Sequence, residues 1–207
     1  QRNAQDGVSL VQTAEGARSE TTNILQRVRE LSVQAANGTQ STSNRAALDT
    51  EVQQLLSQID DIATDTEFNG LSILSANQTV TLQAGPNPSQ TLVVTVEGAK
   101  SDDLKVSTVA VSSVALAVSA ISTVDIALQS VSTLRSNLGA YQNRLEFTIN
   151  TLAIQEENAA AAESMIRDAN IAQETIGFTR NQILVSAGTS VLAQANVVPQ
   201  TALTLLR

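Results

Sequence analysis

The residues able to do chemistry in this chain are carboxylates, serines and a few arginines. Histidine and cysteine are both absent from its 207 residues, which excludes the commonest general base, the commonest metal ligand and any thiolate site. Three acidic pairs stand out: Asp60-Asp61, Asp102-Asp103 and Glu156-Glu157. Adjacent residues on a helix point about 100° apart, and no loop shows the alternating carboxylates of a calcium site. We interpret these pairs as solvated surface, and expect no catalytic residue, metal or cofactor.

Composition narrows the classes of partner. Serine is plentiful, but without histidine or a G-x-S-x-G motif nothing activates it as a nucleophile. The net charge of −8 would repel a phosphate backbone, so we do not expect nucleic acid as a partner. No apolar run approaches the ~20 residues that span a bilayer, so we expect no membrane insertion. Because the chain begins at Gln1 within an expected helix, we also expect residues upstream of it.

The most informative charged motif is QRVREL, residues 26–31. Val28 and Leu31 fall on an apolar helix edge, whereas Arg27, Arg29 and Glu30 point outward or flank that edge. Exposed charges of this kind contribute less than about 1 kcal/mol to stability, so a merely solubilising surface is one interpretation. The alternative is a partner-facing patch, because arginines on a rigid helix make good interface anchors.

Three long helices, expected at about residues 5–36, 43–63 and 121–165, would position this patch. In the first, small and apolar residues recur four and three apart, which is the spacing of a coiled-coil seam: Leu10, Ala14, Ala17, Thr21, Ile24, Val28, Leu31 and Ala35. Asn37-Gly38 predicts a helix stop with a left-handed residue. The second helix repeats the spacing at Leu48, Val52, Leu55, Ile59 and Ile62, and should fold back antiparallel. In the third, the spacing continues through Ile121, Val124, Leu128 and Val131. An extra three-residue step from Val131 to Leu134 then predicts local overwinding.

Between the second and third helices the period falls to two. Asn69-Gly70 predicts a tight turn, and alternating residues on both sides of the GPNP sequence at 85–88 predict a β-hairpin within a region of about 71–108. Leu104 and Val106 suggest a third short strand. The tract Ser107–Ser122 fits either a strand or the entry into a helix.

The last segment, residues 171–207, resumes helical spacing but has a wide apolar surface that nothing else in the chain obviously covers. We expect it to associate with other molecules through these residues: Ile183, Leu184, Val191, Leu192, Leu203 and Leu206. The predicted fold class is therefore mainly α. It comprises an elongated antiparallel helical coiled-coil rod with a small β-hairpin region (residues 1–170) and a C-terminal helix (residues 171–207).

Several stretches resemble bacterial flagellin. They are RNAQDGVSLVQTAEGA (2–17), LQRVRELSVQAANGT (25–39), FNG (68–70), TLRSNLGAYQNRLE (133–146) and, most specifically, ILVSAGTSVLAQANVVPQTALTLLR (183–207). The resemblance spans both ends of the chain and leaves only about residues 79–118 without matching motifs. It implies a minimal, N-terminally truncated filament subunit without outer variable domains, secreted to the bacterial flagellum. There the last helix pairs with an N-terminal helix to form the inner tube of the filament.

The same resemblance implies partners and a recognition site. The partners are copies of the chain itself, a flagellar export chaperone, the filament cap protein and the innate immune Toll-like receptor for flagellin. The positions that match the receptor-binding face are Gln26, Arg27, Leu31, Glu51, Val124, Asp125 and Leu128. Val124 stands where isoleucine is usual in the family.

Self-association for motility is the leading hypothesis, with alternatives from other classes. One is a cell-surface binding module for a polysaccharide or host receptor, although one tyrosine and three phenylalanines offer few rings for stacking on sugars. A hook–filament junction protein would share the helical plan but not the C-terminal sequence. An enzyme has the weakest support, because no activating residues are present.

Overall fold

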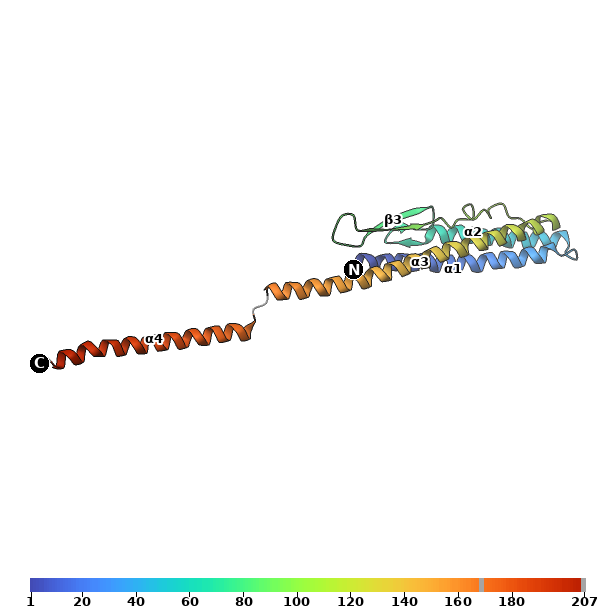
Figure 1. Cartoon of the computed structure of the whole chain (residues 1–207). Coiled ribbons are helices and arrows are strands. Elements are labelled where there is room, and N and C mark those ends of the chain that lie inside the picture. Colours follow the sequence, from blue (N-terminus) through green and yellow to red (C-terminus); the bar gives the residue numbers. More distant parts are fainter. Residues whose placement is uncertain (168–169, 206–207) are drawn as a thin grey trace. The chain divides into compact units, whose positions relative to one another are not determined.

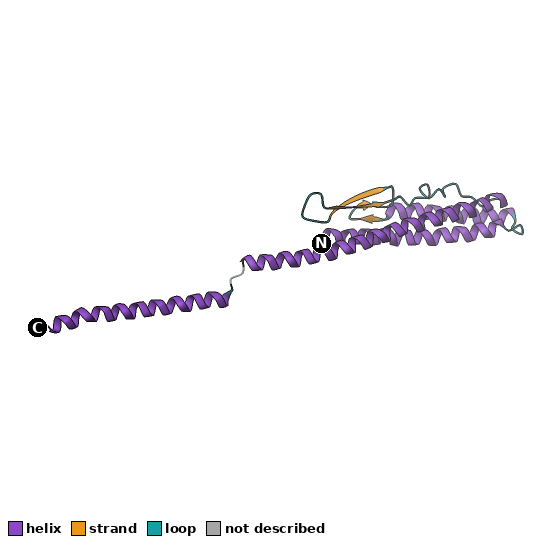
Figure 2. Ribbon diagram, in the orientation of Figure 1, coloured by secondary structure: helices purple, strands orange, loops and turns teal. Residues whose placement is uncertain are grey.

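The computed structural model describes residues 1–167 and 170–205, and most of them are helical (Figure 2). The helices are α1 (Arg2–Ala36), α2 (Thr42–Asp65), α3 (Val114–Arg167) and α4 (Ile171–Leu205). The strands are β1 (Glu67–Phe68), β2 (Leu71–Ser72), β3 (Gln78–Gln83) and β4 (Thr91–Val96). The mainly α fold class with a small β part is therefore confirmed. Contacts divide the chain into two units, Gln1–Gln155 and Glu156–Arg207.

The first unit is built around helices that lie side by side. α1 and α2 form an antiparallel pair, α3 runs along them, and the β3–β4 hairpin lies against the N-terminal half of α1 (Figure 1). Two apolar clusters hold these elements together. One joins the second half of α1 to α2, to the start of α3 and to the segment that precedes it. The other joins the first half of α1 to the hairpin and to a later part of α3.

The buried edge of α1 is rotated from the predicted one. Residues at a regular spacing of four and three are buried, namely Gly7, Val11, Ala14, Arg18, Thr21, Leu25, Val28, Ser32 and Ala35. Leu10 and Leu31 are buried beside this seam, as predicted, but Ala17 and Ile24 are only partly buried. Three members of the seam are polar, Arg18, Thr21 and Ser32. Counting apolar residues passed over Arg18 and Ser32 in favour of neighbouring positions.

In α2, too, buried residues are displaced by one position from the predicted seam. A displacement of the same kind in α3 removes the extra three-residue step that was predicted there. In α2, Leu56 and Ala63 are buried, in place of Leu55 and Ile62. In α3, the seam uses Ala127 rather than Leu128 between Val124 and Val131. The steps are then regular, and the predicted overwinding at Val131 is wrong. Ala127 occupies the seam position, while the larger Leu128 is partly buried beside it.

The end of α1 departs from the predicted left-handed cap. Asn37 is extended, with φ −67° and ψ 126°, and Gly38 does not have a positive φ. Instead, Arg45 of α2 donates hydrogen bonds from Nε to the Ala35 carbonyl (2.9 Å) and from Nη2 to the Asn37 carbonyl (3.1 Å). A side chain from the next helix therefore satisfies carbonyls that a left-handed turn would otherwise satisfy.

The predicted turns of the β region are present. Asn69 and Gly70 both have positive φ, 52° and 75°, and connect β1 to β2 in a tight turn of the kind that favours Asn-Gly. β3 and β4 pair antiparallel from Gln78↔Val96 to Gln83↔Thr91. Alternate residues of β4 are buried against the rod: Leu92, Val94 and Val96. The hairpin was predicted correctly because both the turn residues and the period of two are local signals.

The predicted third strand near Leu104 and Val106 does not form. The Val106 amide bonds to the Ser101 carbonyl (2.8 Å) and the Lys105 amide to the Asp102 carbonyl (3.0 Å). Lys105 has φ 58°, so this segment is a turn of the Schellman type with lysine where glycine is usual. Leu104 and Val106 are still buried, because the turn directs both side chains into the core.

The segment that leads into α3 is held on α2 by polar side chains. Asp49 Oδ1 accepts from the Val111 amide at 2.6 Å, and Gln53 Nε2 donates to the Val109 carbonyl at 2.9 Å. Asp60 accepts from both the amide and the hydroxyl of Ser101. α3 then begins at Val114, seven residues earlier than expected. The ambiguous tract therefore contributes an irregular segment followed by the first turns of the helix.

The second unit contains the end of α3 and all of α4. Every described side chain of α4 is exposed or partly exposed within the chain. Large apolar residues, among them Ile171, Phe178 and Val185, remain exposed along its length. Within the described chain this helix therefore has no apolar core of its own.

Candidate interaction surfaces

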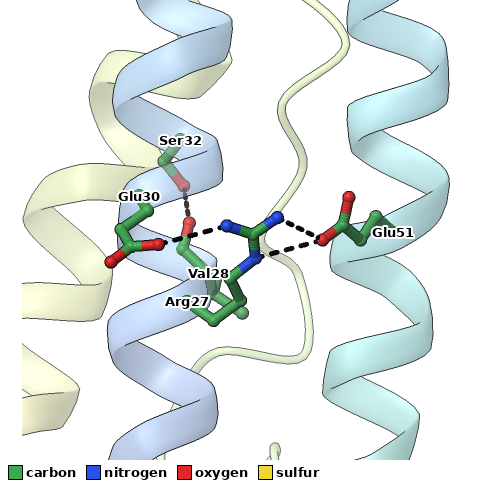
Figure 3. Close-up of polar contacts among 5 residues, drawn as sticks. All are labelled: Arg27, Val28, Glu30, Ser32 and Glu51. Carbon is green, nitrogen blue, oxygen red and sulfur yellow. Dashed lines mark hydrogen bonds and ion pairs between the residues drawn. The ribbon is translucent and has the colours of Figure 1, made fainter.

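The QRVREL motif forms a charged surface across α1 and α2. Arg27 donates from Nε (3.1 Å) and Nη2 (2.8 Å) to the same Glu51 oxygen on α2, and from Nη1 to Glu30 Oε2 (3.2 Å). Figure 3 shows the Arg27 guanidinium between these two carboxylates. The hydrogen bond to Glu51, followed by the smaller effect of the one to Glu30, raises the pKa of Arg27 above its ordinary value. A charged group that neighbouring helices already hold in place can meet a partner with little loss of side-chain entropy.

Arg29 extends this surface to α3. Its Nε donates to Asp125 Oδ1 at 2.6 Å, and this bond raises the pKa of Arg29. The two residues lie 96 positions apart in the sequence. No spacing rule could have identified that partner, because the packing of α3 against α1 brings it into reach.

The seven residues of the predicted recognition site divide into two groups. Gln26, Arg27 and Asp125 are exposed, and Glu51 and Leu128 are partly exposed. Leu31 is 1% exposed and Val124 is 0% exposed, and both belong to the apolar cluster beneath the surface. Their placement corrects the sequence-based surface: they support it from below and offer a partner no contact area. The spacing of apolar residues places Leu31 on the buried edge of α1, and only the family resemblance includes it in the recognition site.

The second candidate surface is α4. Ile183, Leu184, Val191 and Leu192 are each 61–67% exposed, as the sequence analysis anticipated for an uncovered helix. The side chains of Leu203 and Leu206 lie outside the described part of the chain. Because the four described residues do not share one narrow stripe, a single partner helix would not cover them all. Several neighbours around the helix would be needed.

Neither surface has the features of a catalytic or metal site. Among the described residues, no group of three or more His, Cys, Asp or Glu side chains could hold a metal ion. The carboxylates of the QRVREL surface are already used to hold Arg27 and Arg29. This arrangement suits recognition by a macromolecule.

Among the described residues, one apolar stretch between Val114 and Val197 is long enough to cross a membrane. This departs from the expectation that no segment would approach that length. A single such helix is weak evidence for insertion, because helices that pack in soluble assemblies pass the same test.

Family models place the chain in a known group. The model of the bacterial flagellin N-terminal helical region matches residues 1–79, and that of the C-terminal helical region matches residues 121–206. The chain belongs to the bacterial flagellin family. The residues of both interaction surfaces fall within these two matched regions.

Individual flagellins agree with this assignment over the whole chain. The flagellin of Halalkalibacterium halodurans is 45% identical over 209 residues, covering 100% of this chain and 77% of the relative. The flagellin of Bacillus subtilis is 43% identical over 241 residues, covering 100% of this chain and 79% of the relative. The crystal structure of Bacillus cereus flagellin is similar with a TM-score of 0.63 and 34% identity, covering 78% of this chain and 94% of that one. These matches favour a filament protein over a polysaccharide-binding module.

Proposed function

We propose that this chain is a structural subunit that assembles with copies of itself into the flagellar filament, using α4 as a principal contact between molecules. The observation that carries the proposal is the exposure of large apolar side chains along α4. Burial of one Leu or Ile side chain contributes about 1.5–3 kcal/mol. Four such residues, Ile183, Leu184, Val191 and Leu192, would therefore favour association strongly.

The apolar surface of α4 also supports the family partners proposed for this chain. An exposed helix of this kind promotes uncontrolled aggregation before assembly. An export chaperone that covers α4 until secretion would prevent this, and the filament cap would receive the subunit outside the cell. The exposed side chains therefore fit a subunit whose α4 helix is uncovered only at its site of assembly.

Charge substitutions in α4 test the assembly proposal. In the double variant Leu184→Asp and Leu192→Asp, two carboxylates would have to be buried without partners, so we expect it to remain monomeric. The matched control carries Gln173→Glu and Asn181→Asp, which add the same charge at polar positions of the same helix. Sedimentation and electron microscopy over a range of concentrations measure assembly.

In the full-length protein, the parent and the control should form filaments or large oligomers, while the double variant should not. A full-length parent that stays monomeric at every concentration would contradict the proposal. Equal assembly of all three proteins would contradict the role of α4.

We also propose that the QRVREL surface is read by the innate immune receptor for flagellin. The supporting observation is the Arg27 guanidinium, which is half exposed yet held by Glu30 and Glu51. Its pre-organisation is typical of an interface anchor. Gln26, Asp125 and Leu128 would contribute the surrounding contacts.

Receptor binding by Arg27→Ala tests this second proposal. We expect at least a tenfold loss of affinity, which corresponds to about 1.4 kcal/mol. Arg167→Ala is the matched control, because Arg167 also forms an exposed ion pair, with Glu163 at 2.7 Å, but lies far along the sequence from QRVREL. Unchanged affinity of Arg27→Ala, or an equal loss in the control, would argue against this surface.

A further inference from the structure

Arg18 is a charged residue in an apolar seam. It lies in the middle of α1, is 1% exposed, and occupies a seam position between Ala14 and Thr21. Charged side chains are almost never fully buried unless they are paired. The surroundings of its guanidinium group therefore need a complete account.

Protein atoms satisfy only part of this guanidinium. Nη2 donates a hydrogen bond to the carbonyl of Glu97, directly after β4. Nε and Nη1 are buried, and no described residue accepts from either atom. Glu15, one turn earlier, repeats the pattern: Oε1 accepts from Arg135 Nε at 2.8 Å, while Oε2 is buried without a donor among the described residues.

A small cavity lies beside Arg18. It has a volume of about 50 Å³, and Arg18 lines it together with Thr95, Glu97, Asn137 and Tyr141. A larger polar hollow of about 450 Å³ shares Glu97 and Asn137 with it. A cavity of this kind needs about 10–15 Å³ for each water molecule. The small one therefore has room for a few water molecules, and the hollow offers a route to them.

The charges around the cavity decide which ligand suits it. Two cations, Arg18 and Arg135, face the carboxylates of Glu15, Glu97 and Asp103, so the local charge disfavours an anion. The unpaired atoms of Arg18 are donors, which disfavours a metal ion. A neutral molecule that accepts from a guanidinium and donates to a carbonyl or carboxylate would satisfy both sides.

We propose that the cavity beside Arg18 is a permanent water-binding site, in which at least one water molecule accepts a hydrogen bond from Nε or Nη1. The water molecule in turn donates hydrogen bonds to acceptors that line the cavity, such as the Asn137 side chain or the Glu97 carbonyl. Arg18 and its water then form a hydrated polar link between α1 and the exit of the hairpin. The link is built into an otherwise apolar interface.

A crystal structure of the whole chain, at a resolution that shows ordered water, tests the proposal directly. We expect a water molecule within hydrogen-bonding distance of Arg18 Nε or Nη1. In Arg18→Met, which keeps the length of the side chain but removes every donor, that water should be absent. Arg29→Met is the matched control, because Arg29 lies on the same helix but its charge is exposed.

Oxygen-17 relaxation dispersion provides a second readout in solution by counting long-lived internal water molecules. Arg18→Met should lose at least one of them, and Arg29→Met should lose none. Three results would overturn the proposal: a dry cavity in the parent protein, an anion bound there, or a guanidinium whose Nε and Nη1 both bond to protein oxygens. Circular dichroism would confirm that both variants fold, and the parent crystal structure decides the question without them.

Discussion

Truncation of Leu31 distinguishes a core residue from a contact residue. The family resemblance placed Leu31 in the recognition site, but its side chain is 1% exposed and packs in the cluster that joins α1, α2 and α3. Leu31→Ala removes three carbon atoms, worth about 2.4 kcal/mol at about 0.8 kcal/mol for each buried CH₂. The cavity left behind raises the expected loss of unfolding free energy to about 3 kcal/mol.

Val33→Ala is the matched control two residues along the same helix. Val33 is 50% exposed, so losing two carbons costs about half of 1.6 kcal/mol, or about 0.8 kcal/mol. The better helix propensity of alanine returns about 0.5 kcal/mol. The net change in unfolding free energy should therefore be about 0.3 kcal/mol, a tenth of the effect at Leu31.

Tyrosine fluorescence during urea unfolding measures both changes. The chain has one tyrosine and no tryptophan, and Tyr141 packs against the core of the first unit, so its signal reports on that unit and not on α4. Receptor affinity per folded molecule should be unchanged in Leu31→Ala. A loss of stability below about 1 kcal/mol, or a loss of affinity at full stability, would refute the placement of Leu31 in the core.

Four further substitutions test local features by the same urea assay. Gly16→Ala should raise the unfolding free energy by about 0.5–1 kcal/mol through helix propensity, because a Cβ at this position meets no atom within 4 Å. Gly7→Ala should not stabilise the protein, because a Cβ at Gly7 would lie 2.3 Å from a hairpin side chain. Lys105→Gly should stabilise by about 1 kcal/mol, because lysine occupies a left-handed position; an unchanged midpoint would argue against that turn. Asp49→Ala should lower the unfolding free energy by about 1.5–3 kcal/mol and speed hydrogen exchange of the Val111 amide. Slow exchange of that amide in the variant would show that its hydrogen bond to Asp49 is dispensable.

Local signals predicted the hairpin and the helices well. Asn69-Gly70 and the alternating strands act over a few residues, so their structure follows from their own sequence. Long periodic helices are equally robust, although α3 begins earlier than its apolar pattern indicated. The third strand failed because the turn around Lys105 depends on packing and on the bonds from α2, not on alternation.

The helix seams show the limit of pattern reading. Apolar counting selected Ile24, Leu55 and Leu128, yet the structure buries Leu25, Leu56 and Ala127. Several adjacent residues are apolar in each case, so two neighbouring edges score almost equally. Only contact with the other helices decides between them. The same contact places a buried arginine at position 18, which no apolar pattern would propose.

The amino-acid sequence by itself determined the helical class, the hairpin turn, the exclusion of histidine and cysteine chemistry, and the apolar character of α4, whose side chains are uncovered from residue 171 to residue 197. These follow from composition and from interactions between residues close in the chain. Tertiary structure alone decided which edge of each helix is buried and that Arg29 pairs with Asp125. Those outcomes depend on how distant helices rotate against one another, and a rotation of one residue exchanges core for surface.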